Sequence, residues 1–228
     1  MTDNPAKEAA GRAAARLLRD GMRIGLGTGS TAYWFIVAAA EAVRSGLRIE
    51  GVATSDSSAR LAAGLGIRLV ELDRAGVDLA VDGADQVDPE LRLIKGGGGA
   101  HVREKVVAAA ARRFVVVADE TKLVAGLSGP LPVEVLRFGA DATLGALEEC
   151  GAEFRLRADG EGRLQVSDSG NLLADGHFDK ITDPEGLARR LQAIPGVVGH
   201  GLFLGMAGLV LVGDASGGVR EVTAARSG

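Results

Sequence analysis

Two aspartates lie directly after an apolar segment of the sequence. Asp82 and Asp85 follow the apolar run 77–81 and are separated by Gly83 and Ala84. Such a run is typical of a strand buried on both faces, and ligands of parallel sheets bind at the carboxyl ends of such strands. Two carboxylates separated by a glycine turn can accept the hydroxyl protons of a small polyol. An acidic turn without a ligand is the competing interpretation, because Asp-Gly pairs are common in turns.

Four consecutive glycines at positions 96–99 follow Lys95. Ordering them costs conformational entropy, so we expect this backbone to approach a ligand closely; a flexible linker is the alternative. Glu104 lies in the first turn of a helix predicted over 100–112, where the helix dipole favours its ionised form. A general base must be ionised. The alternative is a glutamate that is simply favoured in a first helical turn.

Three glycines and three hydroxyl side chains lie close together in the segment 25–32. Backbone N–H groups at a helix start, with hydroxyls beside them, can bind a phosphate. Read from Gly27, the segment also fits the dinucleotide pattern Gly-x-Gly-x-x-Ala, so a nicotinamide-dependent dehydrogenase is an alternative. The acidic partner expected about 20 positions later could be Glu50, but it precedes the end of its predicted strand. A glycine turn without a ligand is the third interpretation.

Lysine is rare in this chain, with five among 26 basic residues, so its positions are informative. A retained lysine suggests a need for a compact point charge. Lys122 follows the predicted strand 114–118 and could hold a phosphate or a hydroxyl, although a solvated turn explains it equally well. The five lysines are Lys7, Lys95, Lys105, Lys122 and Lys180.

The sequence carries no motif typical of a metal site, and we expect neither a metal nor a cofactor. His101, His177 and His200 lie far apart, and no paired-cysteine spacing occurs. Neither a nucleotide-triphosphate loop nor a serine-hydrolase elbow is present.

Strands and helices alternate over the first half of the chain, which predicts an α/β fold with a parallel sheet. The predicted strands are 22–26, 48–53, 67–70, 77–81, 91–94 and 114–118, and the predicted helices are 5–21, 30–43, 56–65 and 100–112.

After Pro130 and Pro132 the pattern changes to that of a smaller α+β domain, predicted over 130–202. Its expected elements are strands at 133–136 and 153–156, two strands around the turn 167–170, and helices at 141–150 and 184–194. Strands at 202–204, 209–212 and 219–222 are expected to return to the first sheet, so that 1–129 and 203–228 form the larger domain.

The composition excludes some classes of protein. A chain of 228 residues with a net charge of −4 gives no electrostatic reason to bind nucleic acid. No apolar stretch approaches the roughly 20 residues that cross a membrane. The single Cys150 and the absence of a signal-like start at 1–5 predict a cytoplasmic protein.

The order of these motifs resembles that of type A ribose-5-phosphate isomerases, and the likeness covers nearly the whole chain. The matching motifs are Gly-Thr-Gly-Ser-Thr at 27–31, Asp-Gly-Ala-Asp at 82–85, Lys-Gly-Gly-Gly-Gly at 95–99, Arg-Glu-Lys at 103–105 and Ala-Asp-Glu-Thr-Lys at 118–122. The pair His101-Val102 departs from the family pattern, in which we expect two apolar residues.

The resemblance implies an enzyme of the non-oxidative pentose phosphate pathway that interconverts ribose 5-phosphate and ribulose 5-phosphate through an enediolate. It implies a Rossmann-like catalytic domain, a ferredoxin-like insert, and a homodimer or larger assembly. Glu104 is the implied proton acceptor, and Asp82, Asp85 and Lys95 are the other implied catalytic residues. The implied substrate-binding residues are Thr28, Gly29, Ser30, Thr31, Asp82, Gly83, Ala84, Asp85, Lys95, Gly96, Gly97, Gly98, Lys122 and Lys7.

The isomerisation itself requires one base and one donor for the negative oxygen of the enediolate. Glu104 would move the proton, Lys95 or a glycine N–H would stabilise the oxygen, and the two aspartates would handle ring opening and hydroxyl protons. The binding-module alternative is a sugar-phosphate-sensing domain of a transcriptional regulator. That class needs a helix-turn-helix, whereas only about one helix precedes the first predicted strand.

Overall fold

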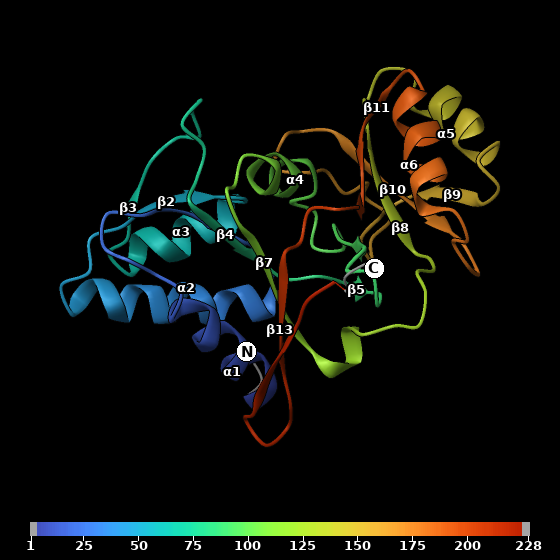
Figure 1. The fold of residues 1–228 in the computed structure, drawn as a ribbon. Coiled ribbons are helices and arrows are strands. Elements are labelled where there is room, and N and C mark those ends of the chain that lie inside the picture. The colour runs from blue at the N-terminus through green and yellow to red at the C-terminus, as the bar shows by residue number, and fades with distance from the viewer. Residues whose placement is uncertain (1–3, 225–228) are drawn as a thin grey trace.

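The computed structural model describes residues 4–224. Its central sheet has the strand order β14-β13-β7-β4-β1-β2-β3, parallel except for the last strand at one edge, β14 (Figure 1). The strands are β1 (Arg23–Leu26), β2 (Glu50–Ala53), β3 (Arg68–Leu69), β4 (Leu79–Asp82), β7 (Phe114–Asp119), β13 (Leu209–Gly213) and β14 (Val219–Val222). The predicted α/β fold with a parallel sheet is confirmed.

Helices cover both faces of this sheet. α1 (Pro5–Ala15), α2 (Ser30–Arg44) and α3 (Asp56–Gly64) share one apolar core with Ile24, Val81 and Val115, whereas α4 (Val102–Ala109) shares the other with Ala80 and Val116. Neighbouring residues of one strand therefore pack into opposite cores, as the two-residue period of a strand requires. This double burial is the reason why the central strands read as continuous apolar runs.

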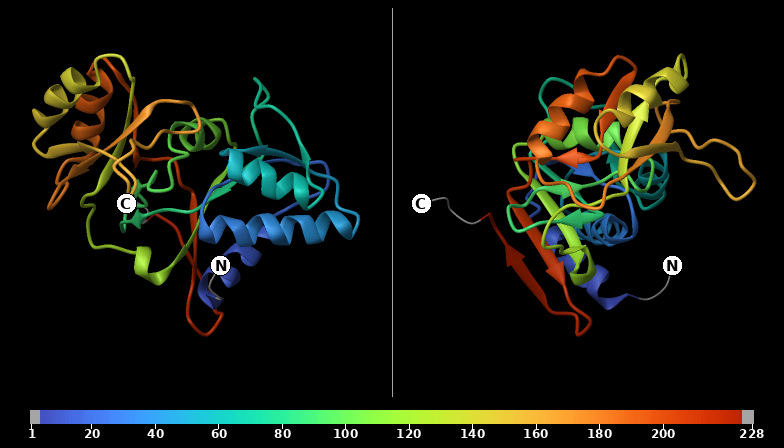
Figure 2. Two further views of the ribbon diagram at one scale, coloured as in Figure 1. Left: turned by 180° about the vertical axis from the view of Figure 1, so that it is seen from behind. Right: turned by 90° about the vertical axis from the view of Figure 1, so that its right-hand side faces the viewer.

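A second sheet, with the order β11-β8-β10-β9, is antiparallel and forms a separate core with α5 (Ala140–Glu148) and α6 (Pro184–Ala193). Figure 2 shows from two further sides that it lies beside the central sheet and not in continuation of it. Its strands are β8 (Leu131–Val135), β9 (Glu153–Leu156), β10 (Leu172–His177) and β11 (Val197–His200).

A small sheet with the order β12-β6-β5 connects the two parts. β12 (Leu202–Phe203) pairs with β6 (Leu93–Ile94), which pairs with β5 (Gln86–Val87). The expected domain boundary between 202 and 203 thus falls within a strand, and the division into two domains stays a prediction. β6 matters for the site because it ends directly before Lys95.

Several predicted element boundaries were wrong. α1 ends at Ala15 and not near 21, because Leu17 and Leu18 bond to carbonyls three residues back, which tightens and ends the helix. α4 is shorter at both ends than the predicted 100–112. Of the two strands expected around the turn 167–170, only β10 forms, because the chain before the turn makes only isolated bridges. The short strand β5 was not predicted. No helix among residues 4–224 is long and apolar enough to span a membrane.

Candidate active site

The chemistry-bearing residues meet because three neighbouring parallel strands end at the same edge. β1, β4 and β7 are adjacent and deliver the segment 27–31, Asp82, and the short 3₁₀ helix η1 (Glu120–Lys122). These segments therefore lie close together at the carboxyl ends of the strands, where the sequence predicts the site. A cavity of about 150 Å³ is lined by Thr28, Gly29, Ser30, Thr31, Gly83, Ala84, Asp85, Lys95, Gly96, Gly98, Glu104 and Lys122.

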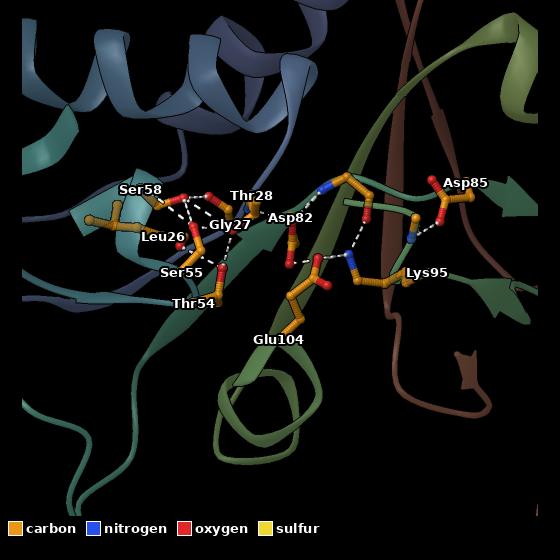
Figure 3. Close-up of polar contacts among 12 residues, drawn as sticks. Leu26, Gly27, Thr28, Thr54, Ser55, Ser58, Asp82, Asp85, Lys95 and Glu104 are labelled. Carbon is orange, nitrogen blue, oxygen red and sulfur yellow. Dashed lines mark hydrogen bonds and ion pairs between the residues drawn. The ribbon is translucent and has the colours of Figure 1, made fainter. Parts of the chain in front are cut away.

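A buried cluster of three charged side chains lies at one end of this cavity. The Lys95 Nζ lies 2.9 Å from Glu104 Oε1 and 3.1 Å from Asp82 Oδ2, and donates to the Gly83 carbonyl (Figure 3). Relative exposures are 2%, 5% and 3% for Lys95, Glu104 and Asp82. Charges this deeply buried persist only when paired and hydrogen-bonded, and here one ammonium serves two carboxylates.

The cluster holds Glu104 ready to exchange a proton near neutral pH. Burial raises the pKa of Glu104 to about 7, with Lys95 lowering it and Asp82 raising it again. Burial opposes the charge on Lys95, but the two carboxylates raise its pKa above the usual value. Lys95 therefore stays a cation, while Glu104 has the pKa expected of a general base that works near pH 7.

The start of α2 also lines this cavity. Gly29 directly precedes this helix with a φ of 105°, a conformation that a residue without a Cβ adopts easily. Gly29 and the first residues of α2, Ser30 and Thr31, line the cavity. The Lys7 Nζ donates to Ser30 Oγ at 2.9 Å, and Lys122 lines the cavity from η1. Helix N–H groups and two cations form a suitable environment for a phosphate.

Thr28 lines the cavity, and its hydroxyl bonds to three other hydroxyl groups. It bonds to Thr54 Oγ1 at 2.8 Å, Ser55 Oγ at 2.7 Å and Ser58 Oγ at 3.1 Å, so it ties the loop to the start of α3 (Figure 3). The Thr28 N–H donates to Asp82 Oδ1 at 2.9 Å. Three members of this hydroxyl network lie in the segment 54–58, and Thr28 joins them from the glycine loop, a contact that no local pattern predicts.

Asp85 lies apart from the charged cluster. Its Oδ2 accepts from the Gly97 N–H at 2.9 Å, at the far side of Lys95 from Asp82 (Figure 3). Asp85 thus lines the cavity, whereas Asp82 is buried and is not among the residues that line it. This separation suits two different proton-handling roles better than one shared site.

His101, the departure from the family pattern, is buried beneath the glycine segment. Its backbone is left-handed, with a φ of 40°, and its ring packs against Gly96, where a Cβ would collide with it. Burial lowers the pKa of His101 to about 4, so the ring is neutral. Among residues 4–224 its buried Nε2 has no hydrogen-bond partner, whereas its Nδ1 lies 3.7 Å from the buried carboxylate of Glu134. The ring is therefore a buried, neutral side chain at a position where the family pattern predicts an apolar one.

Lys105 faces away from the cavity although it neighbours Glu104. Its Nζ donates to the carbonyls of His200 and Leu202, and burial lowers its pKa to about 7. Within residues 4–224, no group of three or more histidine, cysteine or acidic side chains is arranged to hold a metal ion.

Gly27 allows the close approach between its loop and Asp82. A Cβ at this position would collide with the carboxylate and the backbone of Asp82. We expect Gly27→Ala to lower the free energy of unfolding by about 1–3 kcal/mol, as overpacking does. Denaturant titration measures this, with Gly145→Ala in α5 as the matched control, since a methyl group there meets open space. Equal stability of the two variants would contradict a tightly packed Asp82.

Known proteins match most of this chain in sequence. The model of the family described as ribose 5-phosphate isomerase A (phosphoriboisomerase A) matches residues 50–217. The ribose-5-phosphate isomerase A of Agrobacterium fabrum is 48% identical over 216 residues, covering 91% of this chain and 93% of the relative.

Solved structures give the same result. Ribose 5-phosphate isomerase A from Methanocaldococcus jannaschii superposes with a TM-score of 0.90 at 42% identity, covering 95% of this chain and 97% of that one. A ribose-5-phosphate isomerase in complex with phospho-erythronic acid has the same TM-score and coverage at 38% identity. With motif order, fold and relatives in agreement over nearly its whole length, the chain belongs to the ribose-5-phosphate isomerase A family.

Proposed function

We propose that this chain interconverts D-ribose 5-phosphate and D-ribulose 5-phosphate, with Glu104 as the base that moves a proton between C2 and C1. The observation that carries this function is the buried cluster of Glu104, Lys95 and Asp82 beside a cavity that the start of α2 also lines. A sugar phosphate needs both features, one for the chemistry and one for the phosphate.

The mechanism follows from the positions of these groups. Glu104 takes the C2 proton of the open-chain aldose, and the electron pair forms an enediolate whose negative oxygen is stabilised by Lys95 and by glycine N–H groups. Glu104 then returns the proton to C1. The proton of the C2 hydroxyl leaves and the C1 oxygen gains one, and we assign this exchange and ring opening to Asp82 and Asp85.

The two alternative functions are not supported. In a dinucleotide-binding domain, Glu50 would have to reach a ribose near the glycine loop, but it begins β2 and pairs with Arg68 at 3.0 Å. β2 runs parallel to β1, so Glu50 lies at the amino ends of these strands, whereas the glycine loop follows the carboxyl end of β1. A regulator would need a helix-turn-helix before the first strand, and among the described residues only α1 precedes β1.

The proton-transfer route makes a prediction about isotopes. A proton held on a carboxylate exchanges with solvent in a fraction of turnovers before it returns to carbon, so deuterium should accumulate at C1 of ribulose 5-phosphate as the equilibrium is cycled in deuterated water. NMR of the product measures this label. Unlabelled product from an active enzyme would overturn proton transfer through Glu104, whereas absence of any conversion of ribose 5-phosphate would overturn the proposed function.

Assembly and location complete the proposal. A homodimer or larger homo-oligomer is supported by the large apolar side chain of Phe138, which is 93% exposed, next to the half-exposed Leu136. Light scattering with Phe138→Ser would test the oligomeric state, since the variant should shift toward a monomer.

A cytoplasmic location is supported by the single, unpaired Cys150.

A further inference from the structure

A side chain from the second sheet reaches the glycine segment of the site. Arg157 directly follows β9, and its Nη1 donates to the Gly97 carbonyl at 3.0 Å and to the Gly96 carbonyl at 3.3 Å. The same guanidinium holds Asp175 of β10 with two further bonds, from Nε at 2.8 Å and from Nη2 at 2.5 Å. A forked pair of this kind fixes the plane of the guanidinium.

Holding a carbonyl also fixes the N–H of the same peptide unit. In a trans peptide the carbonyl and the N–H point in opposite directions. With the Gly96 carbonyl on Arg157, the Gly97 N–H must point away from Arg157, and it does, donating to Asp85 Oδ2 at 2.9 Å. By the same geometry, the Gly97 carbonyl on Arg157 turns the N–H of Gly98 away from Arg157, and Gly98 lines the cavity.

Glycine makes such a constraint necessary. Residues without a Cβ adopt positive and negative φ with similar ease, so peptide units among four successive glycines can rotate at little cost. Gly96 and Gly99 already have φ values of 104° and 87°. A donor that bridges two successive carbonyls selects one orientation from these alternatives.

We propose that Arg157 is a positioning residue that turns the N–H of Gly98 toward the substrate and keeps the N–H of Gly97 on Asp85, with Asp175 holding the guanidinium in place. This role rests on the proposed isomerase function, in which a glycine N–H stabilises the enediolate oxygen. The second sheet thereby contributes to catalysis through one side chain that itself stays outside the reacting atoms.

The test compares Arg157→Met with Arg155→Met. Arg155 lies two residues earlier on β9, where it is exposed and paired with Glu153. Replacing Arg155 therefore removes the same charge without changing a contact to the glycine segment. We expect Arg157→Met to lower kcat about 10- to 100-fold with KM within about threefold, less than the 10²–10³ of deleting an oxyanion donor outright. Arg155→Met should leave both constants unchanged. Arg157→Lys keeps the charge beside Asp175 but cannot bridge both carbonyls, so its kcat should fall nearly as far as that of Arg157→Met.

Binding separates positioning from general loss of structure. Phospho-erythronic acid carries a carboxylate at the end opposite its phosphate, so its Kd should rise about 10-fold in Arg157→Met. The Kd of inorganic phosphate, which uses the start of α2, should stay the same. Parallel weakening of both ligands, equal losses in Arg155→Met, or unchanged kcat would overturn the positioning role. If the unmodified protein failed to isomerise ribose 5-phosphate, the proposed function would fail, while the contrast between the two ligands would still test the orientation of the glycine N–H groups.

Discussion

Replacing Glu104 with glutamine should lower kcat for ribose 5-phosphate by about two to four orders of magnitude while KM changes little. The amide keeps the shape of the side chain and can still accept a hydrogen bond from Lys95 Nζ, at 2.9 Å in the structure. It cannot take a proton from carbon. In the proposed function the start of α2 binds the phosphate and Glu104 does not contact it, so we expect binding to survive the loss of the base.

The control is a glutamate without any contact to the site. Glu149→Gln, at the exposed end of α5, removes one carboxylate and should leave kcat unchanged. Coupled assays of the purified variants over a range of substrate concentrations separate kcat from KM. Near-normal turnover of Glu104→Gln would remove Glu104 from the role of base.

The same variant tests the effect of burial on Glu104. Because its pKa is about 7, kcat/KM should rise as the pH rises through neutrality, when the base becomes ionised. The stability of the fold should change with pH in the opposite direction to kcat/KM. Between the ordinary value of 4.5 and pH 7 the folded state holds a proton that the unfolded chain has released, so the Glu104 contribution to the free energy of unfolding falls as pH rises. Denaturant titrations across this window should show a slope in the original protein that Glu104→Gln lacks.

Much of the site could be predicted from the sequence because it is encoded by local rules. Asp82 follows an apolar strand, and ligands meet parallel sheets at that end. Gly27 and Gly29 precede a helix, which predicts exposed N–H groups. Each of these expectations needs only a few neighbouring residues, and each of these segments lies beside the cavity.

The remaining features depend on contacts between distant segments, which no local pattern contains. Arg157 reaches carbonyls 60 residues earlier in the chain, and nothing around it distinguishes it from Arg155 or Arg163. The hydroxyl of Thr28 bonds to Ser55 and Ser58, which lie about 30 residues later in the chain, and no local pattern predicts these contacts. Side-chain direction at the site is therefore a property of the assembled fold.

Replacing Lys95 with methionine should reduce kcat by about two to four orders of magnitude through two separate effects. The enediolate oxygen loses its cation, a contribution of roughly 10²–10³ in rate. In addition, the attraction that lowers the pKa of Glu104 disappears, so burial and Asp82 raise that pKa further. Fewer molecules then carry an ionised base at pH 7, and the rise of kcat/KM with pH should move to higher pH.

Stability distinguishes this account from a simple folding defect. Without Lys95, two buried carboxylates face each other without a cation, which costs about 3–5 kcal/mol when both are ionised. The loss should therefore be larger at pH 8 than at pH 5, where Glu104 binds a proton, and the double variant Lys95→Met/Glu104→Gln should recover stability but not activity. Lys180→Met, at an exposed position, is the matched control. A rise in KM at constant kcat would make Lys95 a binding residue only, and the enediolate oxygen would then depend on the glycine N–H groups alone.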